Sequence, residues 1–133
     1  MHPNAEMLRR NYDAFSRGDV EPMIESFTDE IRWHVSGRSP VAGDYVGTPE
    51  VLRFFGSMME LYGGTLQLEV VDVFADDTLG VVVTEERAQY AGKPLEYTGI
   101  HRWALEDGKV VAFQNYTDDI YDEFWAREAD SDS

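Results

Sequence analysis

Three polar residues, Glu86, His101 and Asn115, are of the types that move protons on a carbonyl compound. An imidazole can shuttle a proton near neutral pH, and a carboxylate can orient it or act itself. An amide can donate a hydrogen bond to a developing enolate oxygen. Enolisation, aldol closure and addition of water all need such a set. An apolar surrounding raises the pKa of a carboxyl group towards the range where it works as an acid or base. These residues are therefore the candidate catalytic cluster, with His101 as the main proton-transfer residue.

Side chains alternate between the two faces of a strand, and this pattern predicts which residues share a side of the sheet. In one predicted strand, Trp103 marks the inward face and His101 shares that face. In the next predicted strand, Val111 and Phe113 mark the inward face and carry Asn115 with them. The alternation thus places His101 and Asn115 on one side of the sheet.

The strand predicted over residues 79–90 has valines on both faces, so alternation alone leaves its register open. One register turns Glu86 inward, together with Thr84. The other register turns Glu85 and Arg87 inward instead, because a shift of one residue exchanges the two faces.

The elements that must position these residues follow from hydrophobic periodicity and from Gly, Pro and capping residues. Helical periods dominate before residue 63, apart from an alternating stretch at 31–35, and a period of two dominates after it up to residue 118. The predicted helices span residues 3–17, 20–27, 49–62 and 120–127, and the predicted strands span 31–35, 65–74, 79–90, 95–105 and 110–118. Residues 36–47 are predicted as a loop, and four-residue hairpin turns join the last four strands. We therefore predict an α+β fold, with a cone-shaped, curved antiparallel sheet and three helices from the N-terminal half packed on its concave face.

The composition fits one soluble domain over residues 1–133, with a frayed acidic tail at about 128–133. The sequence has no cysteine, which excludes disulfides and thiolate chemistry. It has no apolar run that could span a bilayer and no signal-peptide pattern at residues 1–15, so we expect the protein in the cytoplasm. The formal net charge of −15 argues against nucleic acid and anionic membranes as partners.

We expect no metal and no cofactor. The three histidines, His2, His34 and His101, lie far apart, and no His-Glu pair has the spacing of one helix face. No glycine-rich phosphate loop and no G-x-S-x-G motif occur in the sequence.

Several short segments, taken in order, resemble the nuclear transport factor 2-like superfamily, and within it the SnoaL-like polyketide cyclases and ketosteroid isomerases. The segments are residues 12–19 (YDAFSRGD), 27–30 (FTDE), 33–37 (WHVSG), 42–47 (AGDYVG), 54–55 (FF) and 101–110 (HRWALEDGKV). The resemblance implies a cone-shaped fold, a homodimer and a pocket for a small apolar or aromatic ligand. It does not imply one activity, since this scaffold carries isomerases, cyclases, hydrolases, dehydratases and binding proteins.

The resemblance also bears on individual positions. Matching residues 90–93 (YAGK) to the similar hairpin of the isomerases turns Glu86 inward. The aspartate base of the isomerases is replaced by Val35, their oxyanion tyrosine by Asn11, and their protonated aspartate by His101. Steroid isomerisation by that mechanism is therefore not expected.

A second comparison within the scaffold depends on the other register. The water-activating carboxylate–arginine–carboxylate set of the epoxide hydrolases would need Glu85, Arg87 and Asp118 inside.

The predicted wall of the pocket consists mainly of aromatic and other apolar side chains, which are also typical core residues. The predicted ligand-binding residues are Asn11, Tyr12, Phe15, Trp33, Val35, Phe54, Phe55, Met58, Tyr90, Trp103 and Phe113.

The sequence therefore predicts a small cofactor-independent enzyme that performs general acid–base chemistry on an apolar, carbonyl-bearing or polycyclic small molecule. The reaction would be an enolisation, cyclisation, dehydration or hydration. The alternative is a non-catalytic module for small-ligand binding or dimerisation, in which Glu86 and His101 pair with each other or with the backbone and have no free access to the mouth of the pocket. A third interpretation, protein transport or scaffolding, would need an apolar patch on the outer face of the sheet.

Overall fold

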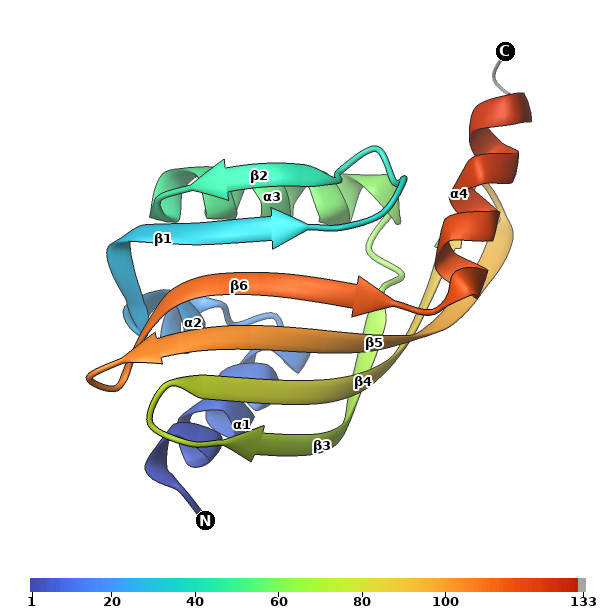
Figure 1. Ribbon diagram of the computed structural model, residues 1–133. Coiled ribbons are helices and arrows are strands. Elements are labelled where there is room, and N and C mark those ends of the chain that lie inside the picture. The colour runs from blue at the N-terminus through green and yellow to red at the C-terminus, as the bar shows by residue number, and fades with distance from the viewer. Residues whose placement is uncertain (132–133) are drawn as a thin grey trace.

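The computed structural model describes residues 1–131, which form a curved, open six-stranded sheet with helices packed on it (Figure 1). The sheet order is β2-β1-β6-β5-β4-β3. The strands are β1 (Phe27–Val35), β2 (Gly43–Val46), β3 (Gln67–Ala75), β4 (Leu79–Tyr90), β5 (Lys93–Glu106) and β6 (Lys109–Thr117). The predicted α+β class is confirmed.

The sheet was expected to be antiparallel, but it is mixed. Strands β3 to β6 form the predicted antiparallel meander, but β1 pairs in parallel with β6. The cause is topological. The meander starts at the edge far from β1 with β3, which runs in the direction opposite to β1. Three reversals of direction then bring β6 back beside β1, running the same way as β1.

Two hairpins are tighter than predicted. β4 is joined to β5 by Ala91 and Gly92, with φ values of 51° and 78°. β5 is joined to β6 by Asp107 and Gly108, with φ values of 50° and 78°. Positive φ at both central residues is typical of the two-residue type I′ turn, whose twist matches that of the strands. The long strands therefore remain paired up to their ends.

Two other local expectations were wrong. The stretch predicted as a loop contains β2, which pairs with the end of β1 and forms one edge of the sheet. Of the two valines near the start of β6, Val110 is buried and Val111 is not. The pairing register shifts between Leu105–Val110 and Ala104–Ala112, so that a β-bulge at Val111 changes which side chains face inward.

Three helices from the N-terminal half, α1 (Pro3–Ser16), α2 (Glu21–Glu25) and α3 (Thr48–Leu61), cover the concave face, as predicted. α1 packs against β3 and β4, whereas α3 packs against β1 and β2. The last helix, α4 (Asp119–Ser131), packs on β5 and β6 at the other end of the sheet (Figure 1). None of the helices in residues 1–131 is long and apolar enough to cross a membrane.

The acidic tail that is predicted to fray covers residues 128–133, and α4 ends within it, at Ser131. An ion pair of 2.7 Å between Lys93 Nζ and Glu128 Oε1 ties this part of the helix to the start of β5. Residues 132–133 lie outside the described part of the chain.

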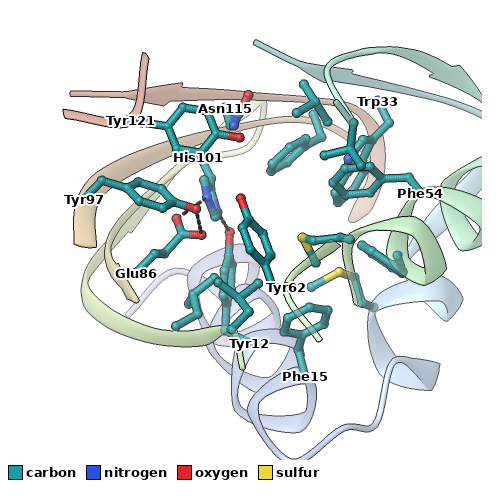
Figure 2. Close-up of a pocket in the computed structure, with 18 of the residues that line it drawn as sticks. Tyr12, Phe15, Trp33, Phe54, Tyr62, Glu86, Tyr97, His101, Asn115 and Tyr121 are labelled. Atoms are coloured by element: carbon teal, nitrogen blue, oxygen red, sulfur yellow. Dashed lines mark hydrogen bonds and ion pairs between the residues drawn. The ribbon is translucent and has the colours of Figure 1, made fainter. Parts of the chain in front are cut away.

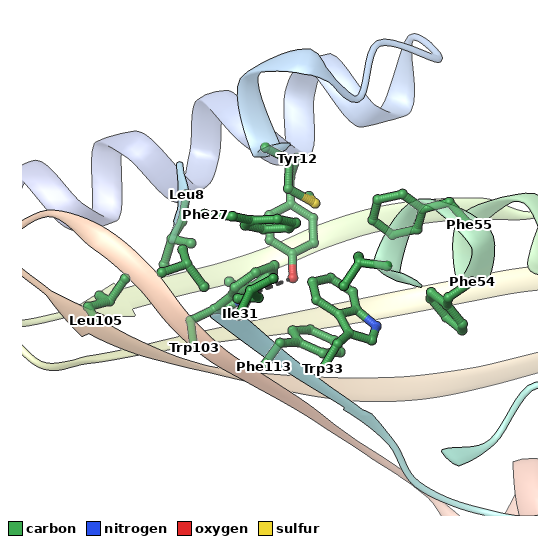
Figure 3. Close-up of a cluster of buried hydrophobic side chains, with 14 of the residues drawn as sticks. Leu8, Tyr12, Phe27, Ile31, Trp33, Phe54, Phe55, Trp103, Leu105 and Phe113 are labelled. Atoms are coloured by element: carbon green, nitrogen blue, oxygen red, sulfur yellow. Dashed lines mark hydrogen bonds between the residues drawn. The ribbon is translucent and has the colours of Figure 1, made fainter. Parts of the chain in front are cut away.

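The main core lies between the helices and the sheet (Figure 3). Trp33 stacks on Phe113 with a centroid distance of 3.8 Å, and Trp103 meets both rings edge-on. A second buried cluster lies under α4 and consists of Tyr62, Ala88, Leu95, Tyr97, Tyr121, Phe124 and Trp125. Aromatic rings fill most of the cone, and only a limited space remains inside it.

We predict that Leu8→Ala lowers the free energy of unfolding by about 3 kcal/mol, because its side chain is fully buried under the sheet. Leu52→Ala is the matched control, since Leu52 also lies on a 14-residue helix but is 42% exposed. We expect the control to cost less than about 1 kcal/mol. Urea unfolding of both variants measures the difference, and equal losses would contradict this packing.

Candidate functional site

Glu86, His101 and Asn115 all line one cavity of about 70 Å³ in the cone (Figure 2). Strand pairing brings them together. His101 on β5 lies opposite Asn115 on β6, and on its other side it lies opposite Val82 of β4, the strand that also carries Glu86. Glu86 faces the cavity from β4, so the inward register is the one that the isomerase-like hairpin indicated. His101 is 8% exposed and Glu86 is 7% exposed.

Glu86 is bound by three neighbouring side chains. Its Oε2 accepts a hydrogen bond from Thr84 Oγ1 at 2.8 Å and lies 3.3 Å from His101 Nε2. Its Oε1 accepts a hydrogen bond from Tyr97 Oη at 3.0 Å. A buried carboxylate is stable only with such partners, and here each oxygen has at least one.

The other nitrogen of His101 faces α1. Nδ1 forms a short hydrogen bond with Tyr12 Oη, which also accepts a hydrogen bond from Trp103 Nε1 at 3.0 Å. Hydrogen bonds thus link Trp103 to Tyr12 (Figure 3) and Tyr12 to His101, and the contact between His101 Nε2 and Glu86 Oε2 extends this chain to Glu86 (Figure 2).

This chain assigns the tautomer of His101. Beside an ionised carboxylate, Nε2 must carry the hydrogen and donate it to Glu86. When the ring is neutral, Nδ1 is unprotonated and accepts the hydroxyl hydrogen of Tyr12. In this neutral arrangement, every hydrogen of the chain is donated once, and the basic lone pair of His101 points at Tyr12.

The pKa of Glu86 lies below its ordinary value of 4.5, which corrects the expectation of a raised value. Burial alone would raise this pKa, but the hydrogen bonds that the carboxylate accepts from His101, Thr84 and Tyr97 together outweigh it. Burial also raises the pKa of Tyr12 and Tyr97, and the negative charge of Glu86 adds to both shifts. Both phenols therefore keep their protons at neutral pH.

Space for the carboxylate comes from Gly99 on β5. A Cβ atom at this position would lie 2.6 Å from Glu86 Oε2 and 2.7 Å from Thr84 Oγ1. Real Cβ atoms do not approach other atoms so closely. The absence of a side chain at Gly99 is thus a condition for the position of Glu86.

Asn115 is fixed by the loop that follows β1. Its Oδ1 accepts a hydrogen bond of 2.7 Å from the backbone N–H of Ser36. The carbonyl side of the amide is therefore held by the protein, and Nδ2 is the donor that Asn115 can offer to a ligand in the cavity.

Nine of the predicted ligand-binding residues line the cavity: Tyr12, Phe15, Trp33, Val35, Phe54, Phe55, Met58, Trp103 and Phe113. Asn11 and Tyr90 do not. Asn11 is buried beside α2, where its Nδ2 donates to Ser26 Oγ at 3.1 Å. Tyr90 packs against Phe124 and Trp125 of α4, because the end of β4 lies under this helix.

Sequence reasoning missed several other residues of the cavity wall: Met23, Val41, Tyr62, Leu66, Leu68 and Tyr121, while Tyr97 was not selected. Tyr62 follows Phe55 and Met58 at helical spacing, so the period of α3 could have indicated it. Tyr97 shares the inward face with His101. No local signal places Tyr121, since its position depends on how α4 folds back over the sheet.

The alternative carboxylate–arginine–carboxylate set is not assembled. Glu85 and Arg87 are exposed on the outer face of β4, and Glu85 accepts a hydrogen bond from Thr98 Oγ1. Asp118 Oδ2 accepts from the backbone N–H of Thr98. In the described part of the chain, no group of three or more His, Asp or Glu side chains could hold a metal ion.

The chain belongs to the SnoaL-like domain family, whose model matches residues 8–113. This match confirms the resemblance to the nuclear transport factor 2-like superfamily. An uncharacterised protein of Mycobacterium tuberculosis is 26% identical over 124 residues, which cover 91% of this chain and 95% of that protein.

Solved structures share the fold. Bal32a, from a soil-derived mobile gene cassette, is 33% identical with a TM-score of 0.83, covering 92% of this chain and 95% of that chain. A protein of unknown function with a cystatin-like fold from Xanthomonas campestris is 24% identical with a TM-score of 0.83, covering 93% of this chain and 98% of that chain.

We predict that Glu86→Gln destabilises the protein by about 2 kcal/mol at pH 7, because the substitution replaces the charged acceptor of His101 with a neutral amide. The lowered pKa of Glu86 means that its contribution is fully present above pH 4.5 and is lost as the pH falls through the lower folded-state value. The difference between wild type and variant should therefore shrink on acidification.

Urea unfolding between pH 7 and pH 3 measures this difference. Glu85→Gln is the matched control, since it removes an exposed carboxylate one residue away. We expect the control to stay within about 0.5 kcal/mol of wild type at pH 7. A gap for Glu86→Gln that is independent of pH would show that Glu86 is not ionised in the folded protein.

Proposed function

We propose that the protein is a small acid–base enzyme that needs no cofactor and enolises an uncharged, carbonyl-bearing small molecule in the cone. The observation that carries this proposal is the hydrogen-bonded chain from Tyr12 through His101 to Glu86 at the wall of a cavity that also presents Asn115. A proton acceptor oriented by a third group is the general arrangement of activated catalytic residues.

The proton path follows from the tautomer of His101. The ligand would lose a C–H proton to Tyr12 Oη while the hydroxyl proton of Tyr12 passes to His101 Nδ1. The two movements must be coupled, because the raised pKa of Tyr12 makes a free tyrosinate inaccessible at neutral pH. The imidazolium that forms would be stabilised by Glu86 at Nε2.

Asn115 would act on the carbonyl oxygen. Enolisation moves negative charge onto this oxygen, and a prealigned N–H donor stabilises the charge more strongly in a site shielded from water. The hydrogen bond from Ser36 prealigns the amide, so Nδ2 would donate without reorganisation.

The lining restricts the ligand. Among the described residues, Glu86 is the one carboxylate and His101 the one basic side chain in the wall, and no Lys or Arg of residues 1–131 lines the cavity. An anionic ligand would be repelled by Glu86 and would find no cation. The walls therefore favour an uncharged compound.

A second candidate function is ligand binding without catalysis. It is favoured by the pairing of Glu86 with His101, which leaves both ring nitrogens of His101 with protein partners. Under this alternative, the buried chain of hydrogen bonds serves only to hold β4, β5 and α1 together.

Exchange of ketone α-hydrogens with D₂O separates the two candidates, and proton NMR measures it with 2-butanone and 2-octanone as probes. We expect the wild type to accelerate exchange, and His101→Ala and Tyr12→Phe to lower the enzymatic rate by about 100-fold or more. His34→Ala is the control, since His34 is a half-exposed histidine paired with Asp44 at 2.6 Å. It should remain within twofold of wild type.

Thermal unfolding of each variant establishes that it is folded, and His101→Gln replaces His101→Ala if the latter is not. No exchange above buffer by the wild type would overturn the enzymatic proposal in favour of ligand binding. Loss of activity in His101→Ala but not in Tyr12→Phe would overturn the path through Tyr12.

The homodimer implied by the resemblance stays a prediction. Three exposed apolar residues on the outer face of the sheet support it: Phe74, Ile100 and Tyr116 are 59%, 42% and 45% exposed, and Ile100 pairs with Tyr116. We expect sedimentation equilibrium to give a dimer for the wild type and for Leu52→Lys on α3, and a monomer for Ile100→Lys. A monomeric wild type would contradict the prediction.

A further inference from the structure

The inner cavity is too small for most of the ligands that such a site would serve. Its volume of about 70 Å³ is roughly half that of the 150 Å³ cavity known to hold one benzene molecule. It has room for a carbonyl group and a few carbon atoms. A larger ligand must place the rest of its body elsewhere.

A second hollow of about 390 Å³ lies directly behind one wall of this cavity. The two spaces share five lining side chains: Phe15, Phe55, Met58, Leu66 and Leu68. Phe15 lies on the side of the inner cavity away from Asn115 and His101 (Figure 2). The exposed residues Ser16, Met59 and Gln67 also line the second hollow, so it opens to solvent.

The partition between the two spaces is one side chain thick and includes a flexible residue. Met58 is half-buried and has three rotatable bonds, so it can change rotamer at low cost. A rotation of Met58 would join the polar end at His101 to the outer hollow.

No charged residue of the described part of the chain lines the outer hollow. Its eleven lining residues contain no Asp, Glu, Lys or Arg, although 28% of the chain is charged and about three such residues would be expected. A surface that is apolar in so acidic a protein suits an apolar group and not an ionic one.

We propose that the outer hollow is a second subsite, and that the ligand is an elongated, uncharged molecule with a carbonyl head and an apolar body. The head occupies the inner cavity beside Tyr12 and Asn115. The body passes Met58 and packs against Phe15, Leu66 and Met59. The identity of the head rests on the proposed function, whereas the two-part shape rests on the two hollows.

A series of 2-alkanones from 2-butanone to 2-nonanone tests this proposal by calorimetric titration of the full chain. If the tail enters the outer hollow, affinity should rise about fourfold with each methylene group along the series. An affinity that levels off beyond about five carbons would confine the ligand to the inner cavity and overturn the proposal.

Met59→Trp fills the outer hollow without touching the inner cavity, because Met59 lines only the outer one and is 54% exposed. We expect this variant to bind 2-nonanone at least tenfold more weakly than wild type and 2-butanone within twofold of it. Leu52→Trp is the control on the same helix, since Leu52 lines neither space. It should bind both ketones like wild type.

A ligand with an anionic tail would instead choose the neighbouring hollow, which carries Arg9 and Arg10 and meets the inner cavity at Tyr12 and Leu68. Tighter binding of 8-oxononanoate than of 2-nonanone would therefore overturn the uncharged body. Rising affinity without hydrogen exchange would retain the two subsites and reject the enzymatic function. Hydrogen exchange that depends on His101, without a rise in affinity along the series, would retain the enzymatic function and reject the second subsite.

Discussion

The buried charge of Glu86 is the constraint on which the site depends. An ionised carboxylate inside an aromatic core is unstable unless its oxygens accept hydrogen bonds, and removing one partner of a buried pair commonly costs about 3–5 kcal/mol. Thr84, Tyr97 and His101 supply these bonds, and Gly99 leaves the room for them. Of the three hydrogen-bond donors, Tyr97 and His101 lie on β5 and Thr84 lies on β4. The site therefore exists only when these two strands pair in this register.

The charge of Glu86 also determines which group donates and which accepts at each successive step of the hydrogen-bonded chain. Because Glu86 accepts at Nε2 of His101, the ring presents a lone pair at Nδ1, and this lone pair takes the hydrogen of Tyr12. Trp103 then donates to the oxygen of Tyr12. One ionised group on β4 thus sets the hydrogen-bond direction as far as helix α1, which explains how a mostly apolar cone can hold an oriented polar group at its centre.

Features of the fold and of the site could be predicted from the sequence when they depend on residues close together in the chain, and not when they depend on distant ones. Alternation placed His101 beside Asn115, since strand geometry is local, and hairpin turns such as Asp107–Gly108 made the meander recognisable. The parallel pairing of β1 with β6 and the bulge at Val111 carry no local signal, because they depend on how distant strands meet. The lowered pKa of Glu86 was missed for the same reason: burial is readable from a pattern, but the donors that outweigh it come from three separate positions.

Under the proposed function, the size of the inner cavity and the buried charge favour one kind of ligand. Aromatic rings such as Trp33 and Phe113 occupy the cone, so the small remaining space is polar mainly where Glu86 and its partners line it. A reactive group placed there is held by a few directional hydrogen bonds, which orient it but bury little apolar area. Affinity must then come from apolar contact outside this space. A site that separates orientation from affinity in this way needs a ligand that is polar at one end only, and the overall charge of −15 further disfavours anions on approach.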